Sequence, residues 1–305
     1  MSEKQQFRLG LVGYGEIGST LGKGLREAGL KQVFSYDKYA FDGPYADLIQ
    51  SRAKAAGVTL VKSNKELADV AELIFSVTPG SASLESADAF APVLDGRHTF
   101  LDFASATPKV KYGVAERLAK TGALLGDGSI MGTPLLGYSM HMLSSGPAGQ
   151  RVIDLLVPWG MSIEYVGDKL GTASGIKILR SVLIKGIEAL IDEMLLAARA
   201  YGLDEAVLAS ASKTLTRPFM DTVESLTPSG VIHSKRRTEE VEMAAEAVEE
   251  AGIEALMARA TAARLRWKDS LGLKDHFKGV VPKNYKIAID ALATKSAATK
   301  PKAAE

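Results

Sequence analysis

Short apolar segments alternate with amphipathic segments along the first half of the chain. The apolar segments predict strands at residues 7–12, 33–36, 58–61, 73–77, 99–102, 124–126, 141–144 and 162–166. Helical patterns separate most of them, and Ser63 followed by Glu66 has the spacing of a capping box, which predicts a helix start. Strands that alternate with helices indicate a parallel sheet covered by helices on both faces.

The pattern changes after Gly167, where strand signals almost vanish. Helices are predicted at residues 172–201, 205–215, 233–251 and 254–271. We therefore expect an α/β N-terminal domain over residues 1–168, followed by an all-α C-terminal domain over residues 169–293. Residues 294–305, TKSAATKPKAAE, lack large apolar side chains and are predicted to form a disordered tail.

Composition narrows the class of protein but indicates no chemistry. The 305 residues are 46% hydrophobic and carry 37 Lys+Arg against 36 Asp+Glu, so the net charge of +1 predicts no nucleic-acid or membrane partner. Because the chain has no cysteine, disulfides and thiolate nucleophiles are excluded, and four scattered histidines argue against a metal site. Neither a signal-peptide pattern nor an 18-residue apolar stretch is seen, so we expect a cytoplasmic protein.

The hexapeptide Gly13-Tyr14-Gly15-Glu16-Ile17-Gly18 follows the first predicted strand and opens a predicted helix. In this context the G-x-G-x-x-G pattern is typical of a Rossmann-type dinucleotide-binding domain. Gly13 would make the tight turn, Gly15 would let the backbone approach a pyrophosphate, and Gly18 would let the helix pack on the strand. Free N–H groups at the helix start would face the phosphates. The alternative is a glycine-rich turn that binds nothing.

Asp37 lies 19 residues after Gly18, where an acidic residue is expected to bond the adenosine ribose. Its carboxylate would repel a 2′-phosphate, so NAD is favoured over NADP, although the neighbouring Lys38 partly compensates. Further cofactor contacts are expected at Val77, Thr78 and Ser105.

Lys177 lies near the start of the long helix predicted from residue 172, just after the expected domain boundary. At 100° per residue, Ser181, Lys185 and Glu188 fall within about 80° of Lys177 around the helix axis. This polar stripe is either a solvated helix face or one wall of a ligand cleft, since clefts between domains commonly bind ligands. A lysine in a partly dry cleft has a lowered pKa and acts as an acid or a base.

A second group of charges is His233-Ser234-Lys235-Arg236-Arg237, followed by Glu239 and Glu240. It is either a charged helix start or an anion clamp for a carboxylate or a phosphate, because arginine binds both groups through two hydrogen bonds.

Together these motifs resemble the β-hydroxyacid dehydrogenase/6-phosphogluconate dehydrogenase superfamily over about residues 7–290. Besides the glycine fingerprint, the D-x-S-T-x-x-P stretch of the family is similar to residues 102–108, and its D-A-P-V-S-G-G motif aligns with residues 127–133. A lysine six residues after a glycine fits Gly171 and Lys177, and the spacing from that lysine to Gly202-Leu203-Asp204 also matches. The run 233–267 looks like a bacterial subfamily whose members are mostly unassigned.

Three departures from the family concern the substrate. Met131 replaces the serine of the substrate motif, Arg180 and Ser181 replace paired asparagines, and the later lysine–aspartate pair is not evident. Because a methionine cannot hold a carboxylate by a strong hydrogen bond, short β-hydroxyacids such as 3-hydroxyisobutyrate are poor candidates.

The resemblance implies an NAD(P)-dependent dehydrogenase that acts on a hydroxy acid or sugar acid, with Lys177 as general acid/base. It implies substrate contacts at Ser129, Met131, Gly132, Thr133 and Ser181, and a homodimer. Two alternatives remain open: an imine reductase, which shares the two-domain architecture, and a non-catalytic NAD(P)-sensing binding protein.

Overall fold

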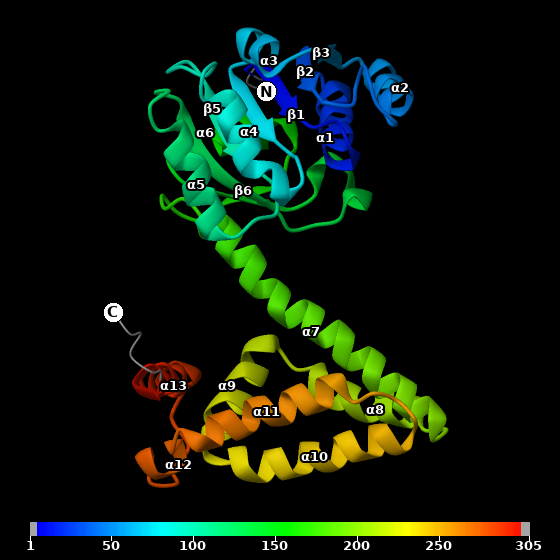
Figure 1. Cartoon of the computed structure of the whole chain (residues 1–305), viewed down its shortest axis with the longest axis vertical. Coiled ribbons are helices and arrows are strands. Elements are labelled where there is room, and N and C mark those ends of the chain that lie inside the picture. Colours follow the sequence, from blue (N-terminus) through cyan, green and yellow to red (C-terminus); the bar gives the residue numbers. More distant parts are fainter. Residues whose placement is uncertain (1–4, 300–305) are drawn as a thin grey trace. The chain divides into compact units, whose positions relative to one another are not determined.

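The computed structural model describes residues 5–299 and divides into two compact units, one ending at Val182 and one beginning at Leu183 (Figure 1). The first unit is an α/β sheet structure, and the second is helical, as the sequence pattern predicts. The division falls inside one helix, α7 (Thr172–Ala200), rather than at residue 168. The reason is that the first turn of α7 is bonded to the sheet, through Ala173 and Ser174.

Eight strands form one sheet in the order β3-β2-β1-β4-β5-β6-β7-β8. All neighbouring strands are parallel except β6 and β7, which are antiparallel. The strands are β1 (Arg8–Val12), β2 (Gln32–Tyr36), β3 (Thr59–Val61), β4 (Leu73–Ser76), β5 (Thr99–Asp102), β6 (Leu124–Ile130), β7 (Met142–Ser145) and β8 (Ile163–Tyr165). The predicted Rossmann-type fold class is confirmed.

Strand β6 is the one strand whose extent differs clearly from the expected one. It continues to Ile130 rather than ending at Gly126, because residues 127–130 pair with β7. Asp127 and Ser129 therefore lie on a buried strand.

Helices cover both faces of the sheet, as Figure 1 shows. One hydrophobic core contains side chains of α1, α2 and α6, among them Leu21, Ile49 and Leu156. A second core contains side chains of α3, α4 and α5, among them Leu67, Phe90 and Leu118. The helices of the first unit are α1 (Glu16–Glu27), α2 (Ala46–Ala56), α3 (Asn64–Val70), η1 (Gly80–Ala82), α4 (Ser83–Phe90), α5 (Pro108–Leu118), η2 (Pro134–Ser139), α6 (Gly149–Leu156) and η3 (Val157–Trp159).

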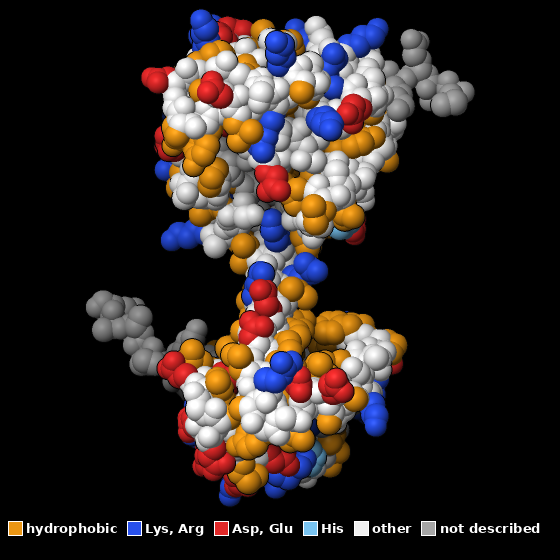
Figure 2. Space-filling model, turned by 90° about the vertical axis from the view of Figure 1, so that its right-hand side faces the viewer, with side chains coloured by type: hydrophobic (Ala, Val, Ile, Leu, Met, Phe, Trp, Pro, Cys, Tyr) orange, Lys and Arg blue, Asp and Glu red, His pale blue; other side chains and the backbone are white. Residues whose placement is uncertain are grey.

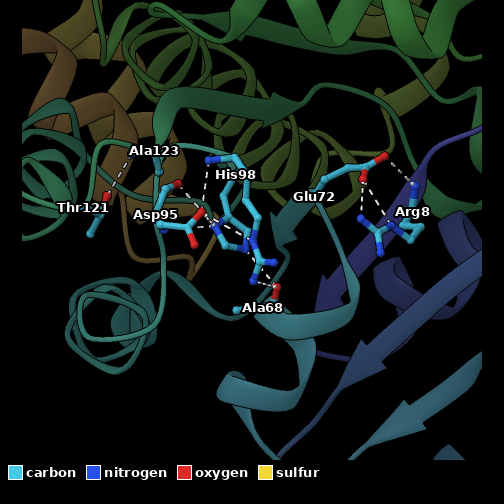
Figure 3. Close-up of polar contacts among 8 residues, drawn as sticks. Arg8, Ala68, Glu72, Asp95, His98, Thr121 and Ala123 are labelled. Atoms are coloured by element: carbon cyan, nitrogen blue, oxygen red, sulfur yellow. Dashed lines mark hydrogen bonds and ion pairs between the residues drawn. The ribbon is translucent and has the colours of Figure 1, made fainter.

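Polar contacts join the segments that lead into β1, β4 and β5 (Figure 3). His98 is buried, its Nε2 lies 2.9 Å from the carbonyl oxygen of Ala68, and its Nδ1 lies 3.0 Å from the carboxylate of Asp95. Arg8 forms an ion pair of 2.8 Å with Glu72. His98, one of the four histidines, thus has a structural role at the start of β5.

The second unit contains the rest of α7 and six further helices among the described residues. These are α8 (Asp204–Leu215), α9 (Phe219–Ile232), α10 (Ser234–Glu250), α11 (Leu256–Ser270), α12 (Leu273–His276) and α13 (Tyr285–Thr299). Its core is small and includes Val231, Ile232, Leu271 and Leu292.

A buried carboxylate on α7 holds the start of α11. Glu193 accepts hydrogen bonds of 2.7 and 2.8 Å from the backbone N–H groups of Met257 and Ala258. A negative charge at this position satisfies free donors and suits the positive end of the helix.

The end of the chain differs from the prediction of a tail over residues 294–305. Helix α13 continues through Thr299 and packs against α9, so residues 294–299 are helical. Lys295, Ala297 and Ala298 have high helix propensity, which favours helix formation without large apolar side chains. Residues 300–305 lie outside the described part of the chain. Within residues 5–299, no helix combines the length and apolar character that a membrane crossing requires.

The turn at residues 13–18 generates a test of packing. A Cβ added to Gly18 would lie 2.1 Å from the carbonyl oxygen of Gly13, whereas one added to Gly15 meets no atom within 4 Å. We expect Gly18→Ala to lower the free energy of unfolding by about 1–3 kcal/mol, as overpacking does. Gly15→Ala, the matched control, should cost less than about 1 kcal/mol, the loss of a glycine N-cap. Urea unfolding measures both, and equal losses would contradict the packing argument.

Candidate active site

The glycine-rich turn leaves a helix start open on the carboxyl side of the sheet. Gly13 has a φ of +95° and donates its N–H to the carbonyl oxygen of Tyr36 at 2.8 Å, which bends the chain between β1 and α1. Gly15 is the N-cap of α1, and no side chain caps the helix there. The space beside Gly15 is empty of protein atoms within 4 Å of an added Cβ. Such a cradle fits the pyrophosphate of a dinucleotide.

Asp37 follows β2 and is fixed by two backbone donors. Its Oδ2 accepts a hydrogen bond of 2.7 Å from the N–H of Tyr14, and its Oδ1 accepts one of 2.9 Å from the N–H of Tyr39. Each oxygen retains a further acceptor position, so the carboxylate can still receive a hydroxyl donor. Lys38 is exposed, and its ammonium lies 5.0 Å from the centre of the Tyr39 ring.

Two other fingerprint residues contribute in different ways. The side chain of Tyr14 is fully buried, and burial raises the pKa of its hydroxyl to about 12, so only its backbone is near the turn surface. Glu16 is exposed in the first turn of α1.

A pocket of about 240 Å³ lies among the loops that follow the strands of the first unit. It brings together six of the predicted site residues: Ile17, Val77, Thr78, Ser105, Gly132 and Lys177. Four other lining residues were not predicted: Pro79, Gly80, Phe103 and Ile130. Pro79 and Gly80 directly follow the predicted Val77–Thr78 segment, so extending that segment by two residues finds them.

Lys177 carries the one amine that lines this pocket. Its Nζ donates a hydrogen bond of 2.6 Å to the hydroxyl of Ser105. Partial burial lowers the pKa of Lys177, and the positive charge of Lys111 lowers it further. A lowered pKa increases the fraction of neutral amine, which is the form that accepts a proton.

A buried ion cluster lies under the pocket, and Lys111 on α5 is its centre. Its ammonium donates hydrogen bonds of 2.7 and 2.8 Å to the carbonyl oxygens of Asp102 and Ala104. It also lies 2.9 Å from the carboxylate of Asp102 and 3.6 Å from that of Asp127. All three ionisable side chains are at most 2% exposed. One ammonium therefore holds the end of β5 and the middle of β6 together.

The same cluster anchors the start of α7. Asp127 accepts hydrogen bonds from the N–H and the hydroxyl of Ser174, and Ser145 accepts one of 3.1 Å from the N–H of Ala173. Burial raises the pKa of Asp127, while the charge of Lys111 opposes that shift. Because Ser174 lies one helical turn before Lys177, these bonds fix the segment that presents the amine.

Sequence reasoning missed Lys111, although its position carries a signal. Lys111, Val114 and Leu118 form the buried face of α5, so a lysine occupies an apolar position of a surface helix. A charged residue at such a position needs a buried partner.

Of the predicted substrate contacts, Gly132 lines the pocket together with Lys177, and the others do not. Ser129 is buried on β6 and does not line the pocket. The N–H groups of Met131 and Gly132 both point to the carbonyl oxygen of His141, at 2.8 and 3.2 Å, so the Gly132 amide has a partner within the protein.

Two predicted hydroxyls also bond locally. The hydroxyl oxygen of Thr133 accepts a hydrogen bond from the N–H of Leu135 and caps η2. Ser181 donates to the carbonyl oxygen of Lys177 at 2.8 Å. Further along the stripe, Lys185 and Glu188 are exposed and form an ion pair of 2.7 Å, as on a solvated helix face. No group of three or more potential metal-binding side chains occurs within residues 5–299.

The ion cluster generates a second test. Lys111→Met keeps the length of the side chain but leaves two buried carboxylates without their cation, and breaking a buried pair costs about 3–5 kcal/mol. We expect a loss of unfolding free energy of this size, measured by urea unfolding. Lys109→Met, at an exposed position of the same helix, should change it by less than about 0.5 kcal/mol. Equal stability of the two variants would contradict a central role for Lys111.

Comparison with known proteins gives one family match and one curated relative. Residues 198–268 match a family model described as a domain of unknown function, DUF1932. An uncharacterised 28.5 kDa protein of Methanothermus fervidus is 28% identical over 235 residues, which cover 77% of this chain and 88% of that protein.

Solved structures match nearly the whole chain. A conserved hypothetical protein of Sinorhizobium meliloti 1021 has 27% identity and a TM-score of 0.60, with 95% of this chain and 97% of that chain covered. A conserved protein of unknown function, described as structurally similar to 3-hydroxyacid dehydrogenases, has 27% identity and a TM-score of 0.58 over 90% of this chain and 100% of that one. A reductive aminase of Aspergillus terreus shares the fold, with a TM-score of 0.71, 18% identity and coverages of 94% and 100%. The chain thus has the fold of 3-hydroxyacid dehydrogenase-like proteins and imine reductases, as its sequence resemblance predicts, with a DUF1932 match in its helical region.

Proposed function

We propose that this protein is an NAD(P)-dependent oxidoreductase that acts on the hydroxyl carbon of a hydroxy acid or sugar acid, with Lys177 as general acid/base. The observation that carries the proposal is the Lys177 amine in the pocket, bonded to Ser105 at 2.6 Å. The pocket also includes Ile17 of the glycine fingerprint, so the amine and the dinucleotide cradle belong to one site.

Similarity to known proteins supports the class of reaction. One protein of 27% identity is described as similar to 3-hydroxyacid dehydrogenases. A reductive aminase of Aspergillus terreus was solved with NADPH, and an imine reductase of the same organism with NADPH4. A bound nicotinamide would supply the hydride acceptor or donor. Gly13, Gly15 and the start of α1 would hold its pyrophosphate, and Asp37 would receive a ribose hydroxyl, which favours NAD.

The residues of the chain would handle the proton. In oxidation, neutral Lys177 takes the proton from the substrate hydroxyl, and in reduction the ammonium returns it. Ser105 holds the amine in place, and the buried contacts of Ser174 fix the helix turn beneath it. The apolar side chains of Val77, Phe103 and Ile130 line the same pocket and would reduce the access of water to the amine.

Imine reduction is the second candidate, and the segment at residues 131–132 favours it. Met131 stands where the family has a carboxylate-binding serine, and the Gly132 amide is bonded to His141. A substrate without an acid group would need neither contact, while the Lys177 ammonium could still donate a proton. Turnover with a panel of cyclic imines and of hydroxy acids separates the two candidates.

Removal of the amine tests the role of Lys177. Lys177→Ala should lower kcat/KM by about 10²–10⁴-fold, the usual contribution of a general acid/base, and leave cofactor affinity unchanged. In the wild type, kcat/KM for oxidation should rise with pH as Lys177 loses its proton and should level off below its ordinary pKa of 10.5, because the pKa is lowered. For reduction the dependence should have the opposite sign.

A lysine outside the pocket provides the control. Lys185→Ala removes an exposed amine two turns further along α7 that is paired with Glu188, and it should leave kcat/KM and the pH profile unchanged. Unchanged turnover in Lys177→Ala, or a midpoint at or above pH 10.5 in the wild type, would contradict the assignment.

We also propose that the protein forms a homodimer through its helices. Leu179 and Val182 on α7 are each 73% exposed, and Leu183, Leu190 and Leu196 further along the helix are also exposed. Figure 2 shows many hydrophobic side chains on the surface of the helical unit. Soluble monomers rarely expose so much contiguous apolar surface, and an isologous contact with a second copy would bury it.

Light scattering at micromolar concentration tests the dimer. We expect the mass of two chains for the wild type and a shift toward one chain for Leu190→Glu, which places a charge on this surface. Glu188→Gln, on the polar stripe of the same helix, should remain dimeric. A wild type with the mass of one chain would exclude the dimer.

A further inference from the structure

The basic segment at residues 235–237 separates into two parts in the structure. Arg236 extends along α10 and forms an ion pair of 2.5 Å with Glu240, as expected of a charged helix start. Arg237 turns toward α9 instead, where its Nη2 donates to the hydroxyl of Ser229 at 2.9 Å and its Nη1 to the carbonyl oxygen of Leu226 at 3.3 Å. Of these two arginines, only Arg237 therefore contacts a neighbouring helix.

Arg237 meets a second cation over Gly230. A Cβ added to Gly230 would lie 3.2 Å from Nη1 of Arg237 and 3.2 Å from Nζ of Lys268 on α11. The two cationic nitrogens are thus separated by at most twice that distance. Both side chains are partly buried, and the missing side chain of Gly230 gives them this room.

Arg264 adds a third positive charge from the preceding turn of α11. Its guanidinium lies 3.9 Å from the centre of the Trp267 ring, a cation–π contact that leaves its hydrogen-bond donors available. Burial lowers the pKa of Lys268, and the charges of Arg237 and Arg264 lower it further.

These three cations differ from the three other arginines on the same pair of helices. Arg236, Arg259 and Arg266 each pair with a glutamate of α10. Within residues 5–299, neither Arg237 nor Arg264 nor Lys268 has a carboxylate at ion-pair distance. The nearby Asp269 bonds to the hydroxyl of Ser234 instead. Like charges held together without a counter-charge cost free energy, which a bound anion would offset.

We propose that Arg237, Arg264 and Lys268 form a binding site for a phosphate group, either free or as a small phosphomonoester. Three positive charges suit the two negative charges of a phosphate dianion better than they suit the one charge of a carboxylate. An arginine fork and a lysine ammonium are the donors that phosphate sites commonly combine. The site lies wholly in the second unit, within the segment that matches DUF1932, and none of its three residues lines the Lys177 pocket.

Thermal unfolding in matched salts tests the site. At equal ionic strength, inorganic phosphate should raise the Tm of the wild type above its value in chloride by about 3 °C or more, because a ligand of the folded state stabilises it by mass action. Glycerol phosphate distinguishes a phosphomonoester from free phosphate by giving the larger shift. Succinate should give a smaller shift than either, and an equal shift with succinate would overturn the assignment to phosphate.

Substitution of Lys268 separates a role in phosphate binding from a structural role, because the two roles predict changes in Tm of opposite sign. In chloride, Lys268→Met should raise the Tm, because it removes one of three repelling charges, and the shift caused by phosphate should disappear. Lys235→Met, at an exposed position of the same basic segment, should keep both the wild-type Tm and the shift. A lowered Tm together with a retained phosphate shift in Lys268→Met would overturn the proposal.

Fluorescence locates the binding event. The chain has two tryptophans, so Trp267 reports alone in a Trp159→Phe background. Because Arg264 stacks on Trp267, phosphate should change the emission in a saturable way, and Arg264→Met should abolish the change. No saturable change would count against the site. The measurement needs neither turnover nor cofactor, so its outcome is separate from that of the proposed oxidoreductase function.

Discussion

The candidate active site depends on one buried ammonium group. Lys111 neutralises carboxylates on two strands and binds the carbonyl oxygens of Asp102 and Ala104, shortly before Ser105. One of those carboxylates bonds the first turn of α7, and Ser105 bonds Lys177. Both sides of the Lys177–Ser105 hydrogen bond are therefore positioned by the same charge. Burial is the main cause of the lowered pKa of Lys177, and the charge of Lys111 lowers that pKa further, so Lys111 affects both the position and the basicity of this amine.

The sequence pattern predicts the layers of the fold but less of the site. Strands and helices of the first unit follow from the apolar periodicity, and residue 172 is predicted correctly as the start of the long helix. The spacing of the glycine fingerprint also predicts the tight turn, and the structure explains the glycine at position 18, because a Cβ there would overlap the carbonyl group of Gly13. Local spacing decides each of these features, and local spacing is visible in one sequence.

Features that depend on pairing across the sheet are not visible in this way. The antiparallel partner β7 extends β6 through Ser129, which buries a residue that motif alignment assigns to the substrate. The same partner strand supplies Ser145 to the start of α7. Likewise, the three unpaired cations near Gly230 come from two helices, Arg237 from α10 and Arg264 and Lys268 from α11, and only Arg237 lies in the basic segment that the sequence singles out.

The two hydrogen bonds of Asp37 have a consequence for engineering of cofactor preference. The carboxylate that would select the ribose also accepts a hydrogen bond from the N–H of Tyr14, inside the glycine-rich turn. Replacement of Asp37 to admit a 2′-phosphate would therefore also remove a hydrogen bond that stabilises that turn. Exchange of cofactor in this protein is therefore a backbone-design problem, in which a new acceptor for the Tyr14 amide has to accompany any new cation at the adenosine end.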